Sequence, residues 1–157
     1  GLPFFQGKAD FGPRHPVART WCIEPTKVAL LGDILISVRA PVGPTNVADQ
    51  KCCIGRGLAA IRPGNSADRD FVLLALRLYE PKIAQLGSGS TFAAIKRDDL
   101  ENFEIPLPSL SEQKRIVAIL NEQMAAVEKA RAAAESQLKT AKMLPAALLR
   151  KAFNGEL

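Results

Sequence analysis

The sequence has a single histidine, His15, which lies between Arg14 and Pro16. A metalloprotease helix or a zinc site with several histidines therefore cannot be built from it. No Gly-Lys-Ser or Gly-Lys-Thr triplet of a phosphate-binding loop occurs, and Gly87-Ser88-Gly89-Ser90 lacks the glycine spacing of a nucleophile elbow or a dinucleotide turn. We therefore expect a protein that is not an enzyme by itself and that has no metal or cofactor of its own.

Cysteine is scarce, and Cys22, Cys52 and Cys53 are an odd number with two neighbours in sequence. This argues against a disulfide framework and favours a reducing compartment, so we expect a cytoplasmic protein. The adjacent pair lacks the two-residue gap of a zinc knuckle, and we expect both cysteines to be small buried residues. No apolar run approaches the roughly 20 residues of a membrane span, so we expect neither an anchor nor a secretory signal.

Positive charge is in excess but unevenly spread. The formal net charge is +5, with +4 in residues 1–66, −2 in residues 67–108 and +3 in residues 109–157. Positive potential over a protein surface attracts nucleic acid, although many cytoplasmic proteins are mildly basic for no such reason. Charge therefore permits a nucleic-acid partner without requiring one.

The first two thirds of the sequence predict strands, turns and short helices. Residues 34–38 are predicted to be a buried strand, because they are apolar, rich in β-branched residues and preceded by a turn signal. Residues 58–61 predict another strand, which Pro63-Gly64 ends. Ser66 can cap a helix that Pro81 limits, and residues 96–102 predict a second short helix. Residues 103–105 predict a final strand, and residues 87–91 a flexible connector. We expect an α+β fold that is rich in β-structure, with a domain of residues 1–108 that ends at Pro106-Leu107-Pro108.

A long helix is the clearest structural signal in the sequence. Ser109 and Glu112 have the spacing of a capping box, and no glycine or proline follows before Pro145. A helix of roughly 34 residues would be about 50 Å long. A heptad seam is predicted from apolar residues at repeating positions: Leu120, Met124, Val127, Ala134, Leu138, Ala141 and Leu148.

This seam predicts a helical arm, residues 109–157, that buries its apolar side against another helix. A homodimer through the arm is the expected arrangement, because a domain of about 108 residues is too small to cover the whole rod. A terminal helix that folds back on its own domain is the alternative.

Basic residues in the Gly- and Pro-rich segments are the candidates for DNA contact. Loops present donors outward, and the planar guanidinium of arginine pairs with guanine edges or phosphates. The candidate DNA-binding residues are Lys8, Arg14, His15, Arg19, Arg39 and Arg56. For each of them a solvated surface role is the alternative.

Three carboxylates offer the one enzymatic alternative. Asp98, Asp99 and Glu101 could chelate a cation, but acidic residues at the start of a short helix more often only complement its dipole.

Several stretches together resemble the specificity subunit of Type I restriction–modification systems. Residues 31–43 (LGDILISVRAPVG) and 54–63 (IGRGLAAIRP) are similar to strands and a loop of that family's target-recognition domains. Residues 87–91, followed by 105–117 (IPLPSLSEQKRIV), resemble the junction between recognition domain and long helix, and residues 149–157 resemble the end of that helix. These stretches occur in the same order as in the family and together cover nearly the whole chain from about residue 28.

The resemblance implies a subunit that selects a DNA sequence and has no catalytic activity. Partner modification subunits would methylate adenine with S-adenosylmethionine, and restriction subunits would translocate and cleave the double-stranded DNA. Family members usually carry two recognition domains and two antiparallel helices, which read a bipartite target, whereas this sequence has one of each. It resembles a half-subunit or the C-terminal half of a longer protein.

Overall fold

The computed structural model describes residues 1–87 and 94–155 and places them in two units, Gly1–Val117 and Ala118–Leu157. The predicted connector at residues 87–91 therefore lies largely outside the described residues. The first unit contains seven strands and three α-helices among its described residues, and it also contains the first turns of α4. The predicted α+β class is confirmed. The boundary that the sequence suggests after Pro108 stays a prediction.

Two small sheets form the first unit. One has the strand order β2-β1-β6-β3, made of Thr20–Cys22, Leu2–Phe5, Cys52–Ile54 and Val28–Ala29. The other has the order β5-β4-β7, made of Thr45–Val47, Ile34–Ser37 and Leu58–Ile61. The predicted strands at residues 34–38 and 58–61 are thus present, and β4 pairs with β7 in antiparallel register.

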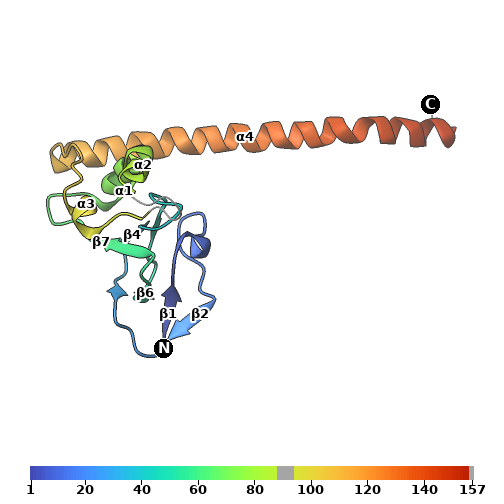
Figure 1. Cartoon of the computed structure of the whole chain (residues 1–157). Coiled ribbons are helices and arrows are strands. Elements are labelled where there is room, and N and C mark those ends of the chain that lie inside the picture. Colours follow the sequence, from blue (N-terminus) through green and yellow to red (C-terminus); the bar gives the residue numbers. More distant parts are fainter. Residues whose placement is uncertain (88–93, 156–157) are drawn as a thin grey trace. The chain divides into compact units, whose positions relative to one another are not determined.

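β4 lies between two hydrophobic cores because its side chains alternate. Ile34 and Ile36 pack with α1 (Arg69–Leu78), while Leu35 packs with the four-stranded sheet. Figure 1 shows the resulting layers of the first unit: α1 and α2 (Glu80–Gln85) lie on one side of β4 and β7, and β1, β2 and β6 lie on the other. Both faces of β4 are therefore buried, as its continuous apolar run requires.

Two details differ from the sequence-based expectations. The N-cap of α1 is Asp68, not Ser66, because the Asp68 carboxylate accepts hydrogen bonds from the backbone N–H groups of Asp70 and Phe71, each at 3.0 Å. Residues 103–105 form no strand. Phe103 instead follows α3 (Arg97–Glu101) and makes an edge-to-face contact with Tyr79, so it joins the core through its side chain and not through a ladder.

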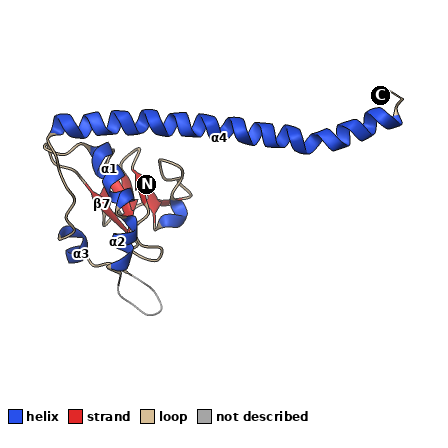
Figure 2. Ribbon diagram, turned by 90° about the horizontal axis from the view of Figure 1, so that it is seen from above, coloured by secondary structure: helices blue, strands red, loops and turns tan. Residues whose placement is uncertain are grey.

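The second unit is helical and consists of most of α4 (Leu110–Phe153), with Pro145 inside the helix (Figure 2). At the start of α4, the Ser109 hydroxyl accepts a hydrogen bond from Glu112 N–H, which is half of the predicted capping box. The Glu112 carboxylate pairs with Arg115 and does not accept a hydrogen bond from the backbone N–H of Ser109, which would be the other half. Within the described ranges, no helix has the length and apolar character that crossing a membrane requires.

Candidate nucleic-acid interface

Three of the candidate cations line one pocket of about 690 Å³. Lys8 belongs to the 3-10 helix η1 (Lys8–Asp10), Arg39 follows β4, and Arg56 follows β6. All three side chains are exposed, and no carboxylate in the described part of the chain forms an ion pair with any of them. The pocket therefore presents three cationic groups that are free to meet an anion.

Close backbone packing fixes the position of Arg56. Gly55 N–H donates to the Phe5 carbonyl at 2.8 Å, which ties the turn after β6 to the end of β1. Gly57 lies so close to this segment that a Cβ there would collide with the Gln6 carbonyl oxygen. The turn can therefore approach η1 only because residue 57 is glycine, and this approach brings Arg56 beside Lys8.

Hydrogen bonds in the loop between β4 and β5 hold the backbone at Arg39. The Ser37 hydroxyl donates to the Arg39 carbonyl at 2.9 Å, and Gly43 N–H donates to the Ser37 carbonyl at 3.0 Å. Gly43 has a φ of +107°, a conformation that favours glycine. The backbone of Arg39 is thus fixed, while its guanidinium is exposed at the pocket.

The acidic residue at this pocket is already engaged. One Asp10 oxygen accepts hydrogen bonds from the backbone N–H groups of Gln6 and Gly7, at 2.7 and 3.3 Å. This carboxylate caps the turn before η1 and holds Lys8 in place. This oxygen therefore serves the local backbone, and no ion pair joins Asp10 to any of the three cations in the described residues.

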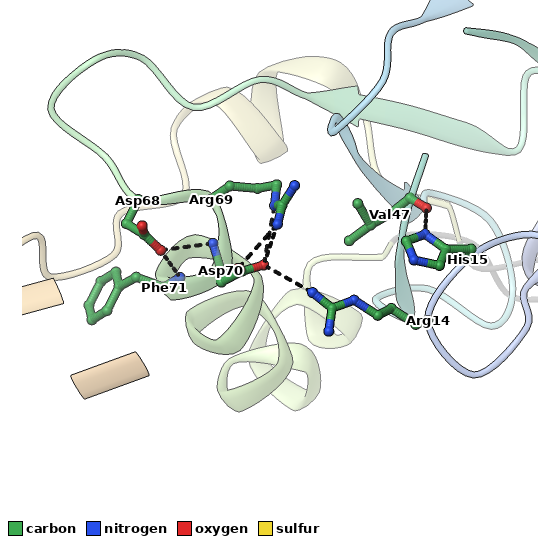
Figure 3. Close-up of polar contacts among 7 residues, drawn as sticks. All are labelled: Arg14, His15, Val47, Asp68, Arg69, Asp70 and Phe71. Carbon is green, nitrogen blue, oxygen red and sulfur yellow. Dashed lines mark hydrogen bonds and ion pairs between the residues drawn. The ribbon is translucent and has the colours of Figure 1, made fainter. Parts of the chain in front are cut away.

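The remaining candidates lie elsewhere in the first unit. Figure 3 shows Arg14 pointing toward Asp70 at the start of α1, 3.8 Å from the carboxylate, which Arg69 also binds at 3.0 Å. His15 donates from Nδ1 to the Val47 carbonyl at 2.9 Å, so this ring supports β5. Arg19 precedes the edge strand β2 and lines neither described pocket. The structure thus unites three of the six candidates and separates the other three.

A second basic pocket, of about 830 Å³, meets the first at Arg56. Its other cationic residues are Lys27, Arg62, Lys96 and Arg97, none of which is among the six candidates from the sequence. Arg62, Lys96 and Arg97 are adjacent to a strand end and a short helix, where nothing in the local sequence distinguishes them from solvated charges. Only the tertiary fold brings them together.

Two of the three carboxylates that could chelate a cation, Asp99 and Glu101, are engaged in local contacts. Asp99 accepts a hydrogen bond from Lys96 N–H at 2.8 Å, and Glu101 pairs with Arg97 at 2.6 Å. Across residues 1–87 and 94–155, no group of three His, Cys, Asp or Glu side chains could hold a metal ion.

The cysteines are free thiols, and two of them are buried as expected. Burial is the main cause that raises the pKa of Cys52 to about 11. The pKa of the half-buried Cys22 is also raised, first by a hydrogen bond with Cys53. A high thiol pKa disfavours the thiolate that a nucleophile or a metal ligand needs, so Cys22 and Cys52 are structural.

Comparison with known proteins places the chain in one family. Residues 26–135 match the family model described as Type I restriction modification DNA specificity domain. The chain is 51% identical over 117 residues to a specificity subunit named for the type I restriction enzyme MjaX of Methanocaldococcus jannaschii, covering 74% of this chain and 28% of that protein. It is 30% identical over 138 residues to the EcoDI specificity subunit of Escherichia coli, covering 88% of this chain and 29% of that protein.

Solved structures agree with this placement. The whole chain superposes on the HsdS subunit from Thermoanaerobacter tengcongensis with a TM-score of 0.77 and 54% identity, and it covers 38% of that chain. A structure of a type I R-M system matches with a TM-score of 0.84 over 39% of its chain, also at 54% identity. The chain thus spans less than two fifths of the relatives described here. It belongs to the Type I restriction–modification DNA specificity domain family.

Proposed function

We propose that the first unit is a target-recognition domain that reads double-stranded DNA and directs a partner adenine methyltransferase to its target. A restriction subunit would join where the host encodes one. In this proposal the chain is a cytoplasmic, non-catalytic component, and S-adenosylmethionine is bound by the methyltransferase partner. Family membership and the printed names of the relatives as specificity subunits support this role.

The observation that carries the proposal is the pocket that Lys8, Arg39 and Arg56 share. Two arginines and one lysine without carboxylate partners can pair with phosphates, or with the N7 and O6 acceptors of guanine in the major groove. Because a hydrogen-bonded loop and a glycine turn support them, little conformational entropy of the backbone would be lost when they bind.

Fluorescence anisotropy with a labelled random-sequence duplex of 40 base pairs tests this site. A triple variant, Lys8→Ala, Arg39→Ala and Arg56→Ala, is compared with Lys129→Ala, Arg131→Ala and Lys142→Ala on α4, which removes the same charge. We expect the pocket variant to lose on the order of tenfold or more in affinity at low salt and the α4 variant to lose much less. Equal losses would mean that charge, and not this pocket, determines binding.

For the second unit we propose docking of α4 against another helix. Apolar side chains of the seam are exposed in the single chain: Met124 by 51%, Val127 by 64%, Leu138 by 55% and Leu148 by 53%. A continuous helix with a seven-residue apolar repeat buries that repeat in a coiled coil. We propose a second copy of this chain as the partner, in which case two-fold symmetry implies a palindromic bipartite target.

An assembly role without sequence reading is the second candidate, and the same exposed seam favours it. In that case α4 would mediate tight association, while DNA binding would be weak and independent of sequence. Methylation mapping with the modification subunit separates the two, because only a reader imposes a sequence motif on the partner.

A further inference from the structure

β7 is an edge strand with a predictable hydrogen-bonding pattern. Among the described residues it pairs with β4 alone in the sheet order β5-β4-β7, with Ile34 opposite Ile61 and Ile36 opposite Ala59. Val38 N–H donates to the Gly57 carbonyl at 2.9 Å, and this pair continues the same register. Since hydrogen-bonded and non-bonded pairs alternate in an antiparallel ladder, Leu58 and Ala60 direct their N–H and C=O groups away from β4.

The Leu58 carbonyl confirms that these groups point away from β4. The Leu58 carbonyl accepts a hydrogen bond from Lys27 Nζ at 2.6 Å, from the side opposite β4, and Leu58 N–H donates to the Gly55 carbonyl. In the described ranges, no hydrogen bond from outside the sheet reaches Ala60. The edge therefore offers an unpaired N–H and C=O at Ala60, which is the pattern onto which another strand can be added.

An apolar groove runs along this edge. The pocket of about 830 Å³ that contains Ala60 is also lined by Val38, Leu76, Ile95, Leu100 and Phe103. These side chains belong to or pack against the core between α1 and β4, and Ile95 is 6% exposed. The floor of the groove is thus apolar, and it suits aliphatic side chains better than phosphate groups.

The rim of the groove is cationic. Arg62 is bound by Asp33 at 2.7 Å and Arg97 by Glu101 at 2.6 Å, but no ion pair in the described part of the chain compensates Lys27, Arg56 or Lys96. Burial first, and the nearby Arg97 second, lower the pKa of Lys27. These crowded, uncompensated charges would be stabilised by carboxylates from outside.

We propose that β7 accepts an added strand from a partner polypeptide, in which aliphatic residues alternate with Asp or Glu. In an extended strand successive side chains point to opposite sides, so one set would enter the apolar groove while the other would meet the cationic rim. The backbone of the added strand would pair with the N–H and C=O of Ala60. This site is distinct from the DNA pocket, although Arg56 borders both.

The test uses the whole chain and a fluorescein-labelled peptide with alternating acidic and aliphatic residues, Val-Asp-Val-Glu-Val-Asp-Val. Its counterpart carries lysine in place of each acidic residue. Fluorescence anisotropy should show saturable binding of the acidic peptide and at least tenfold weaker binding of the lysine peptide. Hydrogen exchange should show slower exchange of the Ala60 amide when the acidic peptide is present, because that N–H becomes paired.

Charge reversals at the two pockets separate this proposal from the DNA site. Lys96→Glu should weaken binding of the acidic peptide at least fivefold, while Lys8→Glu, which changes the charge equally at the other pocket, should leave it unchanged. Lys8→Glu should instead weaken binding to the random-sequence duplex. Absence of peptide binding, or peptide binding without protection of the Ala60 amide, would overturn the added strand. If Lys96→Glu weakens only duplex binding, the groove contacts DNA and the proposal is wrong.

Discussion

The side chain of Gln113, on the first turns of α4, accepts a hydrogen bond at 2.7 Å from the backbone N–H of Asp68, the residue that caps α1. Its amide nitrogen donates to the carbonyls of Ser66 and Pro108, at 3.1 and 2.8 Å. Gln113 is fully buried, at 0% exposed. One polar side chain thus satisfies three backbone groups and joins the start of α4 to the start of α1 within the first unit.

Replacing this residue should therefore destabilise the first unit. Gln113→Leu keeps the approximate volume but leaves Asp68 N–H and two carbonyls without their partner, which should cost about 2 kcal/mol or more in the free energy of unfolding. Urea denaturation measures the change. Gln137→Leu, at an exposed glutamine of α4, is the matched control and should change stability very little. Equal stability of the two variants would contradict the role assigned to Gln113.

The ion pair between the buried Asp33 and the exposed Arg62 predicts a dependence of stability on pH. Burial of Asp33 opposes its ionisation, but hydrogen bonds from Arg62 and from Leu30 N–H outweigh burial and hold the pKa of Asp33 below its ordinary value. The unfolded chain therefore takes up a proton first as the pH falls. The stabilisation is complete above about pH 4 and is lost as the pH falls through the folded-state pKa.

Denaturant unfolding between pH 7 and pH 2.5 checks this dependence. Asp33→Asn should be less stable than the unaltered chain at pH 7, and the difference should shrink as the pH approaches 2.5. Asp49→Asn, at an exposed carboxylate, provides the control. A difference between Asp33→Asn and the unaltered chain that stays constant over the whole range would show that the charge on Asp33 is not the cause.

Arg39 and Arg14 should contribute differently to DNA binding, although the sequence proposes both. Arg39 faces the shared pocket without a carboxylate partner in the described residues, whereas Arg14 lies 3.8 Å from Asp70 beside α1. Arg39→Ala should weaken binding to a random-sequence duplex and lower the slope of log affinity against log salt by about one. Arg14→Ala should change both much less. Circular dichroism would verify that each variant is folded. A larger loss of duplex affinity in Arg14→Ala than in Arg39→Ala would remove Arg39 from the proposed interface.

The exposed seam of α4 predicts self-association that depends on apolar contact. Val127→Glu with Leu138→Glu places two charges in the seam and should shift the chain toward monomer. Ala126→Glu with Ala133→Glu adds the same charge on the helix away from the seam and should leave association intact. Sedimentation equilibrium gives the mass of each. If the unaltered chain and both double variants are monomers, the homodimer is excluded. If both double variants weaken self-association equally, the seam is not the interface.

Local pattern was enough to predict much of the fold. The apolar runs of β4 and β7 and the length of α4 follow from periodicity and from the positions of glycine and proline. Residues 103–105 were predicted as a strand, which was wrong, because a short apolar segment packs equally well through side chains such as Phe103 on Tyr79. The α1 cap shifted by two residues because serine and aspartate are both good N-caps.

The candidate site was only partly accessible from sequence. The sequence proposes Lys8, Arg39 and Arg56 as loop cations, but only the fold brings them together: the pairing of β6 with β1 sets Arg56 beside Lys8, and the loop after β4 adds Arg39. His15 and Arg14 share the same local composition, yet the fold gives His15 a carbonyl partner and Arg14 a carboxylate partner. The sequence does not indicate a site at Lys96 and Arg97, because cations beside a short helix are usually only solvated. Their place at the rim of an apolar groove depends on the tertiary fold.

The most direct test of the central claim is co-expression of this chain with the modification subunit encoded beside it, followed by genome-wide mapping of methylated adenine. If the chain reads DNA as a symmetric pair, one split palindromic motif should be methylated, and it should disappear when the chain is omitted. Arg39→Ala should reduce methylation at that motif. A stable complex that produces no new methylation would contradict the recognition role, and an asymmetric motif would contradict the pairing of two identical copies.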